Sequence, residues 1–326
     1  MRYLVKFWAV SAPVFVVFSL FAACGGSIAG DSGAGIGSGG QAGVPASGYP
    51  DWRERTLLVL TNAVRMDPQG WMDTYYPYST ALPDGSGILL PSSYSAVHPL
   101  YYHDGLNQGA RYHSEDMAGD CGLQHDSCDG TLWSDRLWSY YPVAPGAASG
   151  VGENAAYGFT SPLDTLNQFL CDRVDGACAA DGTPESGHRV NIMRSDWVEA
   201  GMGFVPPHWW TQDFAWATGA PPSTPALAAA SHVMTGTTLR FFANYYAPGD
   251  NARVVDLILE GVPVAMDLDL GTQDAGTWSV TAATAAACQS YYFEAVDPAG
   301  QVWRYPEEGE LRTYGVGACD QDYQAP

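Results

Sequence analysis

The sequence predicts an α+β domain over residues 51–218, followed by a small all-β, Ig-like sandwich over residues 226–326. Three observations lead to this prediction. Apolar residues recur with helical spacing in the first half, two apolar strands close that half, and only short alternating strands follow the proline-rich linker near 219–225. Helices that precede strands are typical of an α+β domain rather than of alternating βαβ units.

Four helices are expected in the first domain. The first begins near residue 51 and ends at Pro68 and Gly70. Its apolar spacing of i, i+3, i+4 and i+7 comes from Leu57, Leu60, Thr61 and Val64. The other three cover about residues 106–118, 133–141 and 162–174. His113 lies on the apolar face of the second helix and is interpreted as a hydrogen-bonded core residue rather than a ligand.

Connections and strands complete the two domains. Residues 144–152 are interpreted as a linker because of their proline and glycines, and residues 201–205 and 213–217 as strands. In the second domain, strands are expected at residues 238–245, 253–260, 277–280, 291–295 and 302–304. No catalytic set of residues is found in this second domain.

The charge balance excludes a nucleic-acid partner. The chain has 14 Lys and Arg against 35 Asp and Glu, for a formal net charge of -21. Binding to nucleic acid or to anionic lipid headgroups requires a basic face, which this composition does not supply.

The N-terminus predicts export. A positive start is followed by an apolar run from Phe7 to Ala23, which is typical of a signal peptide over residues 1–23. The alternative is a retained membrane anchor, for which 17 residues are at the short limit. Phe21-Ala22-Ala23-Cys24 resembles a bacterial lipoprotein signal, which implies a lipidated Cys24. Residues 24–50 are expected to form a Gly- and Ser-rich tether, and Gly25 favours the outer membrane or cell surface.

The cysteine count fits an exported chain. Without Cys24 there remain six: Cys121, Cys128, Cys171, Cys178, Cys288 and Cys319. An even number predicts disulfides, and six cysteines allow fifteen pairings. Pairing neighbours is simplest, giving 121–128, 171–178 and 288–319. A thiolate zinc site is the weaker alternative because no Cys-x-x-Cys occurs.

Several short motifs follow one another in order over residues 52–217. They are Asn62-x-x-Arg65, Ala110–Ala118, Gln124-His125, Asp135-Arg136-Leu137, Gly152-Glu153-Asn154, Ser186-Gly187-His188-Arg189 and Gly201-Met202-Gly203. In this order the motifs resemble the CAP superfamily of cysteine-rich secretory, antigen 5 and pathogenesis-related proteins, with its bacterial SCP-like relatives. The resemblance covers about half of the chain.

That resemblance implies a three-layer α-β-α sandwich with a cleft that holds two histidines and two acids. The corresponding residues here are His125, Glu153, His188 and, for the second acid, Asp172, with Glu185 as the alternative. The family more often has Glu after a Trp where this chain has Phe169 before Asp172.

Such a set of side chains suits three uses. His125, His188 and Glu153 are expected ligands for Zn²⁺ or another divalent cation. Without metal, a carboxylate beside each imidazole would support acid–base work. The third use is to shape a binding cleft. Because no Ser or Cys nucleophile is assigned, binding is favoured over catalysis.

The leading hypothesis is therefore a lipid-anchored cell-envelope protein that binds an apolar small molecule or an envelope component. The alternatives are a metal-dependent hydrolase of peptides or cell-wall material, and an adhesive module that acts through the C-terminal sandwich.

Overall fold

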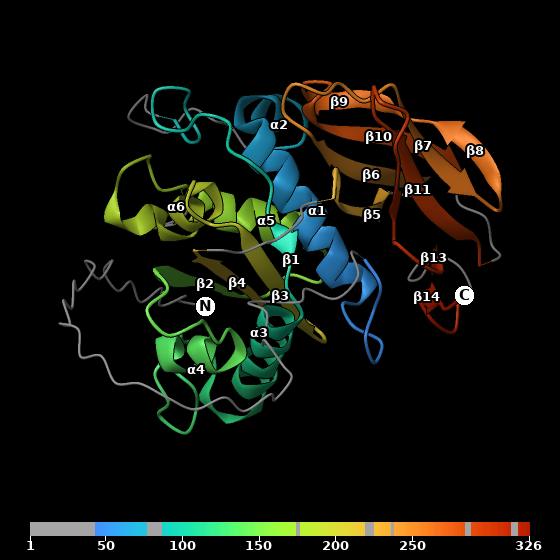
Figure 1. Cartoon of the computed structure of the whole chain (residues 1–326). Helices are drawn as coiled ribbons and strands as arrows, with labels where there is room; N and C mark the ends of the chain where they lie inside the picture. Colours follow the sequence, from blue (N-terminus) through green and yellow to red (C-terminus); the bar gives the residue numbers. More distant parts are fainter. Residues whose placement is uncertain are drawn as a thin grey trace, which may run out of the picture.

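The computed structural model describes residues 43–76, 87–173, 177–218, 225–235, 238–283, 288–313 and 319–326 (Figure 1). The expected signal peptide, Cys24 and most of the expected tether lie outside these residues. Within the described part of the chain, no helix is long and apolar enough to cross a membrane.

A four-stranded sheet in the order β1-β3-β4-β2 forms the middle layer of the first half. Its strands are β1 (Tyr101–Tyr102), β2 (Ser149–Tyr157), β3 (Glu199–Val205) and β4 (Trp209–Ala217). One face is covered by α3 (Asp104–Asp116) and α4 (Trp133–Tyr140). The opposite side holds α1 (Trp52–Met66), α2 (Pro68–Thr74), α5 (Pro162–Cys171) and α6 (Gly187–Met193). The three-layer α-β-α arrangement is confirmed (Figure 1).

Local signals explain the helix ends. The Asp51 carboxylate accepts the backbone N–H groups of Arg53 and Glu54, and Glu54 bonds back to the Asp51 N–H, which forms a capping box at the start of α1. The first helix ends at Met66, directly before Asp67 and Pro68, as expected. Pro68 also begins the next helix. It occupies the first position of α2, where the missing N–H costs no hydrogen bond. The helix α5 ends at Cys171, before the expected residue 174, because Asp172 is left-handed with φ 47°.

Two further boundaries differ from expectation. Residues 149–152 belong to β2 and not to the expected linker. The glycines there are strand residues that leave room for large aromatic rings. A Cβ at Gly152 would lie 2.7 Å from the Trp197 ring. The helix α3 continues into a π-helical turn, Met117–Cys121, and a 3₁₀ turn, Pro184–Ser186, precedes α6.

The C-terminal half is a sandwich of two antiparallel sheets. One has the order β5-β6-β10-β9, and the other β14-β13-β11-β7-β8 with β12 paired to β11. Their bounds are β5 Leu227–Thr235, β6 Thr238–Tyr246, β7 Val254–Leu259, β8 Val262–Ala265, β9 Asp267–Gly271, β10 Ala275–Ala283, β11 Ser290–Val296, β12 Val302–Tyr305, β13 Glu310–Arg312 and β14 Tyr323–Gln324. The five expected strands are present, and β5, β8, β9, β13 and β14 are additional.

The two halves share buried apolar surface. The helix α1 lies against β5, and one core cluster joins α1 residues such as Leu57 to Val233, Phe242 and Leu270 of the sandwich. A second cluster fills the space between the two C-terminal sheets, where Phe241 meets Tyr291 edge-on. The three expected disulfides are confirmed: Cys121–Cys128, Cys171–Cys178 and Cys288–Cys319.

Candidate functional site

The edge strand β2 carries the first acid, Glu153, in its middle. Side chains alternate along a strand, so Glu153 and Asn154 point to opposite faces. Glu153 pairs across the strands with Asp213, and Thr211, two residues away, shares the same face of the sheet. Thr211 bonds to Ser114 of α3, so α3 covers the face that carries Glu153. The Asn154 side faces α1, because Gln212 there bonds to Thr61.

His125 lies against Glu153 on the α3 side. Its Nδ1 is 2.8 Å from Oε1 of Glu153, and it comes from the loop that the Cys121–Cys128 disulfide closes. The carboxylate is completely buried, whereas 33% of the imidazole side chain is exposed. The other ring nitrogen of His125, Nε2, forms no hydrogen bond with the described residues.

Arg136 fixes this pair from α4. One guanidinium nitrogen donates to Oε2 of Glu153, and the other donates to the His125 carbonyl at 3.0 Å and to Ser127 Oγ at 2.9 Å. Burial alone would raise the pKa of Glu153, but the hydrogen bond from His125 and the charges of His113 and Arg136 together lower that pKa below its ordinary value. Glu153 is therefore a carboxylate whose two oxygens are both engaged.

Asp213 lies opposite Glu153 on β4. Hydrogen-bonded and non-hydrogen-bonded residue pairs alternate along an antiparallel ladder. The Gly158 N–H donates to the His208 carbonyl, so counting back five pairs makes Glu153 and Asp213 a non-hydrogen-bonded pair. Side chains are closest in pairs of this kind. Asp213 is fully buried, and neither of its carboxyl oxygens has a geometrically aligned hydrogen-bond donor among the described residues. Burial and the Glu153 charge raise the pKa of Asp213 well above its ordinary value, which favours the protonated form of this carboxyl beside Glu153.

His188 lies against Asp172 on the other side of β2. Its Nδ1 is 2.5 Å from Oδ1 of Asp172, a close contact that is not aligned as a hydrogen bond. Oδ2 of Asp172 accepts the Arg189 backbone N–H at 3.1 Å. The carboxylate is 1% exposed and the imidazole side chain 22% exposed, which repeats the arrangement of the first pair.

Two asparagines tie both pairs to the same point of β2. Asn154 donates to the His188 carbonyl at 3.2 Å. Asn191 of α6 donates to the Glu153 carbonyl at 3.1 Å and to the Asn154 side chain at 2.9 Å. The histidine–acid pairs thus approach one edge strand from its two faces.

The donor atoms left for a ligand differ from those expected. Because Glu153 and Asp172 are occupied by hydrogen bonds and ion pairs, the outer imidazole nitrogens of His125 and His188 are the atoms that can reach a ligand. A carboxylate behind an imidazole is the usual support of a histidine that binds metal, and it also supports an imidazole that accepts a proton.

Residues 58–214 match the family model described as "CAP: Cysteine-rich secretory protein family". These residues form a CAP domain. No curated protein matches this chain. A solved structure, an extracellular protein containing a SCP domain from Bacillus anthracis str. Ames, is similar at 20% identity and a TM-score of 0.33, covering 50% of this chain and 39% of that one.

Other motif residues of the CAP domain hold it together. Asn62 exchanges two hydrogen bonds with the backbone of Leu100, and buried Arg65 donates to the carbonyls of His98, Ile192, Arg194 and Trp197. His113 is fully buried and bonds to the Gln124 carbonyl, in line with the core role expected of it. Burial lowers the pKa of His113 below its ordinary value.

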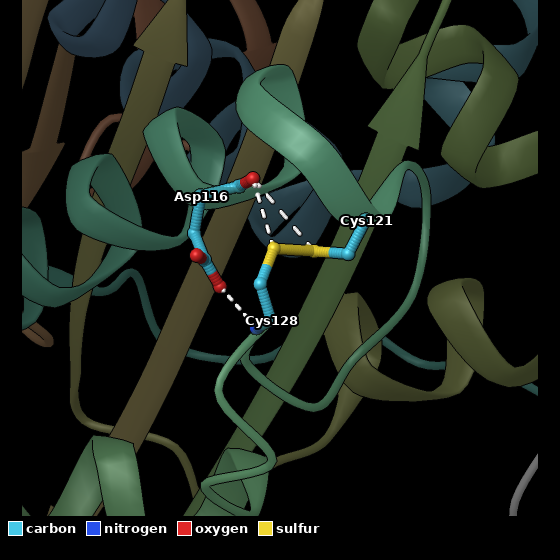
Figure 2. A group of neighbouring side chains, drawn as sticks. All are labelled: Asp116, Cys121 and Cys128. Carbon is cyan, nitrogen blue, oxygen red and sulfur yellow. Dashed lines mark hydrogen bonds between the residues drawn. A yellow bond between two sulfur atoms is a disulfide. The ribbon is translucent and has the colours of Figure 1, made fainter.

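A second group of metal-type donors in the CAP domain contains Asp116, Cys121 and Cys128 (Figure 2). One donor atom of each lies within 4.8 Å of the others. In the structure the two sulfurs are bonded to each other, and Oδ2 of Asp116 accepts the Cys128 N–H at 2.7 Å. Cysteine binds metal as a thiolate and not as a disulfide. In its oxidised form this group therefore serves to close the loop between Cys121 and Cys128.

A surface cavity of about 370 Å³ lies over the outer side of α3. It is lined by Ala46, Ser47, Asp104, Gln108, Arg111, Tyr112, Glu115 and Tyr140. None of these belongs to the histidine–acid pairs, so this volume is not part of the site of the CAP domain.

Sequence reasoning missed Asp213 and the role of Arg136. The signal for Asp213 was a charged residue in the middle of an apolar strand, where only a paired or neutral acid is tolerated. Arg136 was seen only as part of a motif, since nothing in the sequence indicates that α4 places it against β2.

Proposed function

We propose that this protein is an exported cell-envelope protein, held at a membrane by lipidated Cys24, whose CAP domain binds a ligand through His125 and His188. One observation carries the proposal: two partly exposed imidazoles, each backed by a buried carboxylate, flank the same point of one edge strand. The three disulfides and the CAP domain agree with an extracellular location.

Binding is favoured over catalysis by the chemistry of the pairs. All six cysteines of the folded region are in disulfides, so none is a free nucleophile. Glu153 is held by His125 and Arg136, and Asp172 by His188 and the Arg189 N–H, so both acids orient imidazoles rather than face a substrate. The ligand class is an apolar small molecule or an envelope component.

The proposed ion is a divalent cation such as Zn²⁺ held by imidazole nitrogens alone, because His125, Glu153 and His188 are not a group of three donors within 4.8 Å of one another among the described residues. The Nε2 atoms of His125 and His188 would hold it, with Glu153 and Asp172 fixing the ring tautomers from behind. When bound, such an ion would supply a positive charge that attracts a polar group of the ligand. Glu153, which was expected to be a direct ligand, has both oxygens engaged within the protein.

The experiment is a calorimetric titration of the purified folded region with Zn²⁺, followed by a panel of envelope lipids with and without the metal. His125→Ala and His188→Ala should each weaken Zn²⁺ binding by at least about tenfold, since even changes to outer partners of a metal site cost about 10–100-fold. His208→Ala is the matched control, because His208 meets the Tyr157 ring edge-on and lies tilted beside Trp209, and it belongs to neither pair.

Three outcomes separate the parts of the proposal. Equal Zn²⁺ affinity in all four proteins would remove the metal. No saturable lipid binding, or binding unchanged in His125→Ala, would remove the apolar ligand. In cells, Cys24→Ser should move the protein from the membrane fraction to the soluble fraction, and a protein that stays with the membrane would contradict the anchor.

The second candidate is a metal-dependent hydrolase of peptides or cell-wall material. It is supported by the same imidazole–carboxylate pairs, because an imidazole oriented by a carboxylate is a suitable general base. Release of peptide or sugar fragments by the wild type, lost in Glu153→Ala, would establish this function in place of binding alone.

A further inference from the structure

A cluster outside the two histidine–acid pairs has metal-ligand chemistry that depends on oxidation state. It lies where α3 passes into the π-helical turn Met117–Cys121 and the chain then runs through a short loop to Cys128 (Figure 2). Asp116, Cys121 and Cys128 come together there, with one donor atom of each within 4.8 Å of the others. All three are partly exposed, so solutes have access.

The surroundings suit free thiols as well as a disulfide. The Asp116 carbonyl oxygen lies 3.2 Å from the Cys128 sulfur and 3.7 Å from the Cys121 sulfur, so it can accept S–H hydrogen bonds after reduction. The Asp116 carboxylate is held toward Cys128 by the backbone N–H of that residue at 2.7 Å (Figure 2). One carboxylate oxygen of Asp116 accepts that N–H, and the other oxygen takes no part in this hydrogen bond.

We propose that reduction of Cys121–Cys128 converts this loop closure into a binding site for a soft divalent cation such as Zn²⁺, with Asp116 as the third ligand. A dithiol reductant gives two electrons and two protons to the disulfide and becomes a disulfide itself, leaving two thiols. The cation then binds both sulfurs and the carboxylate, and the two thiol protons are released. Solvent completes the coordination.

The geometry requires only a small change. A tetrahedral zinc site has Zn–S bonds of about 2.3 Å, which places its two sulfurs about 3.8 Å apart. The Cα atoms are 5.4 Å apart, so rotation about the Cα–Cβ bonds can supply that separation without unfolding the loop. Among the described residues no other disulfide has a third metal donor within the same range.

The cation would replace the covalent bond as the closure of the loop that carries His125. His125 sits between the two cysteines, and its carbonyl and Ser127 are also held by Arg136. The loop thus has two closed forms, a disulfide form under oxidising conditions and a metal form after reduction. This is independent of whether His125 and His188 bind a ligand.

The test uses Co²⁺ as the probe, because Co²⁺ bound to thiolate gives a charge-transfer absorption band. Residues 25–326 are reduced with dithiothreitol, desalted without oxygen and titrated with Co²⁺. We expect one thiolate-bound Co²⁺ per chain in the reduced protein and none in the oxidised protein. The band should vanish in Cys121→Ser/Cys128→Ser, and Asp116→Asn should weaken binding by at least about tenfold.

The matched control is Cys288→Ser/Cys319→Ser, which removes a disulfide with no third donor and should keep the band. A reduced wild type without the band would overturn the proposal, and so would a band that persists in Cys121→Ser/Cys128→Ser. Reduction that unfolds the domain, seen as lost circular dichroism, would overturn it as well. His125→Ala should retain the band, which separates this site from the histidine pairs.

Discussion

At the scale of single residues, Glu153 shows how the CAP domain accommodates a buried charge. It is a buried carboxylate that meets an imidazole, a guanidinium and a second carboxyl group within one layer. A buried charge is tolerated only when it is paired, and here Arg136 and His125 supply the pairing. Burial and the nearby Glu153 charge raise the pKa of the other carboxyl, Asp213.

Asp213 should make stability depend on pH. Its raised pKa means that the folded state keeps a proton which the unfolded state releases above the ordinary value of 3.8. The stabilisation from this group is full below about pH 4 and is lost as the pH rises toward the folded-state pKa. Asp213→Asn, which cannot ionise, should therefore gain stability relative to wild type as the pH rises from 4 to 8 in a denaturant series.

Asp196→Asn is the control for that series, because the Asp196 side chain is 57% exposed and pairs only with Arg194 at the surface. Its stability profile should stay parallel to that of the wild type. Parallel profiles for Asp213→Asn as well would show that Asp213 is ionised in the folded protein.

At the scale of elements, the contact between α3 and β3 depends on two glycines. A Cβ at Gly201 would lie 2.0 Å from the Asn107 backbone nitrogen, and one at Gly203 would lie 2.2 Å from the Ala110 backbone carbon. The helix therefore rests on the strand backbone itself. This close approach brings His113, at the end of α3, to within 3.6 Å of Glu153.

Gly203→Ala should push α3 away from the sheet. The added methyl would meet backbone, which cannot give way as a flexible side chain would, so we expect a loss of about 1–3 kcal/mol in the free energy of unfolding. The measurement is urea denaturation followed by tryptophan fluorescence. Gly119→Ala is the control, since a Cβ there meets nothing within 4 Å and the change should be near neutral.

At the scale of the whole molecule, the C-terminal sandwich is not a separate appendage. The Arg55 guanidinium of α1, 1% exposed, pairs with Asp322 at 2.9 Å. Trp52 stacks on His232, Thr56 bonds to the His232 carbonyl, and Tyr75 bonds to Asp269. Because these contacts are buried or partly buried and continue an apolar core, the two halves should unfold together.

We therefore expect one thermal transition for residues 43–326. Asp322→Asn should lower its midpoint, because it leaves buried Arg55 without its charge partner, at a cost of about 3 kcal/mol. Exposed Asp320→Asn should leave the midpoint unchanged. Two separate transitions, or an unshifted midpoint in Asp322→Asn, would show that the sandwich folds independently.

An adhesive role of the sandwich should not be tested by deleting residues 226–326, because the two halves share a core. The deletion would expose α1 residues that are now buried against β5, and the CAP domain would lose stability together with the sandwich. Substitutions on the outer face of the sandwich, such as at exposed Val302 and Val254, leave the shared core intact.

The sequence by itself determined what local spacing and side-chain chemistry control. Apolar periodicity placed α1, α3, α4 and α5, because a helix buries one stripe of its own residues. An even cysteine count and short separations led to the disulfides. The motifs led to His125, Glu153, Asp172 and His188, since these residue types stand in a fixed order along the chain.

Only the tertiary structure decided which atoms meet. Strand pairing set Asp213 beside Glu153, helix packing brought Arg136 to both Glu153 and the His125 loop, and the left-handed turn at Asp172 aimed its carboxyl at His188. It also joined the sandwich to α1 across more than 170 residues, as in the 2.9 Å bond between Thr56 and the His232 carbonyl. Such contacts depend on register and packing between distant segments, and local periodicity carries no information about either.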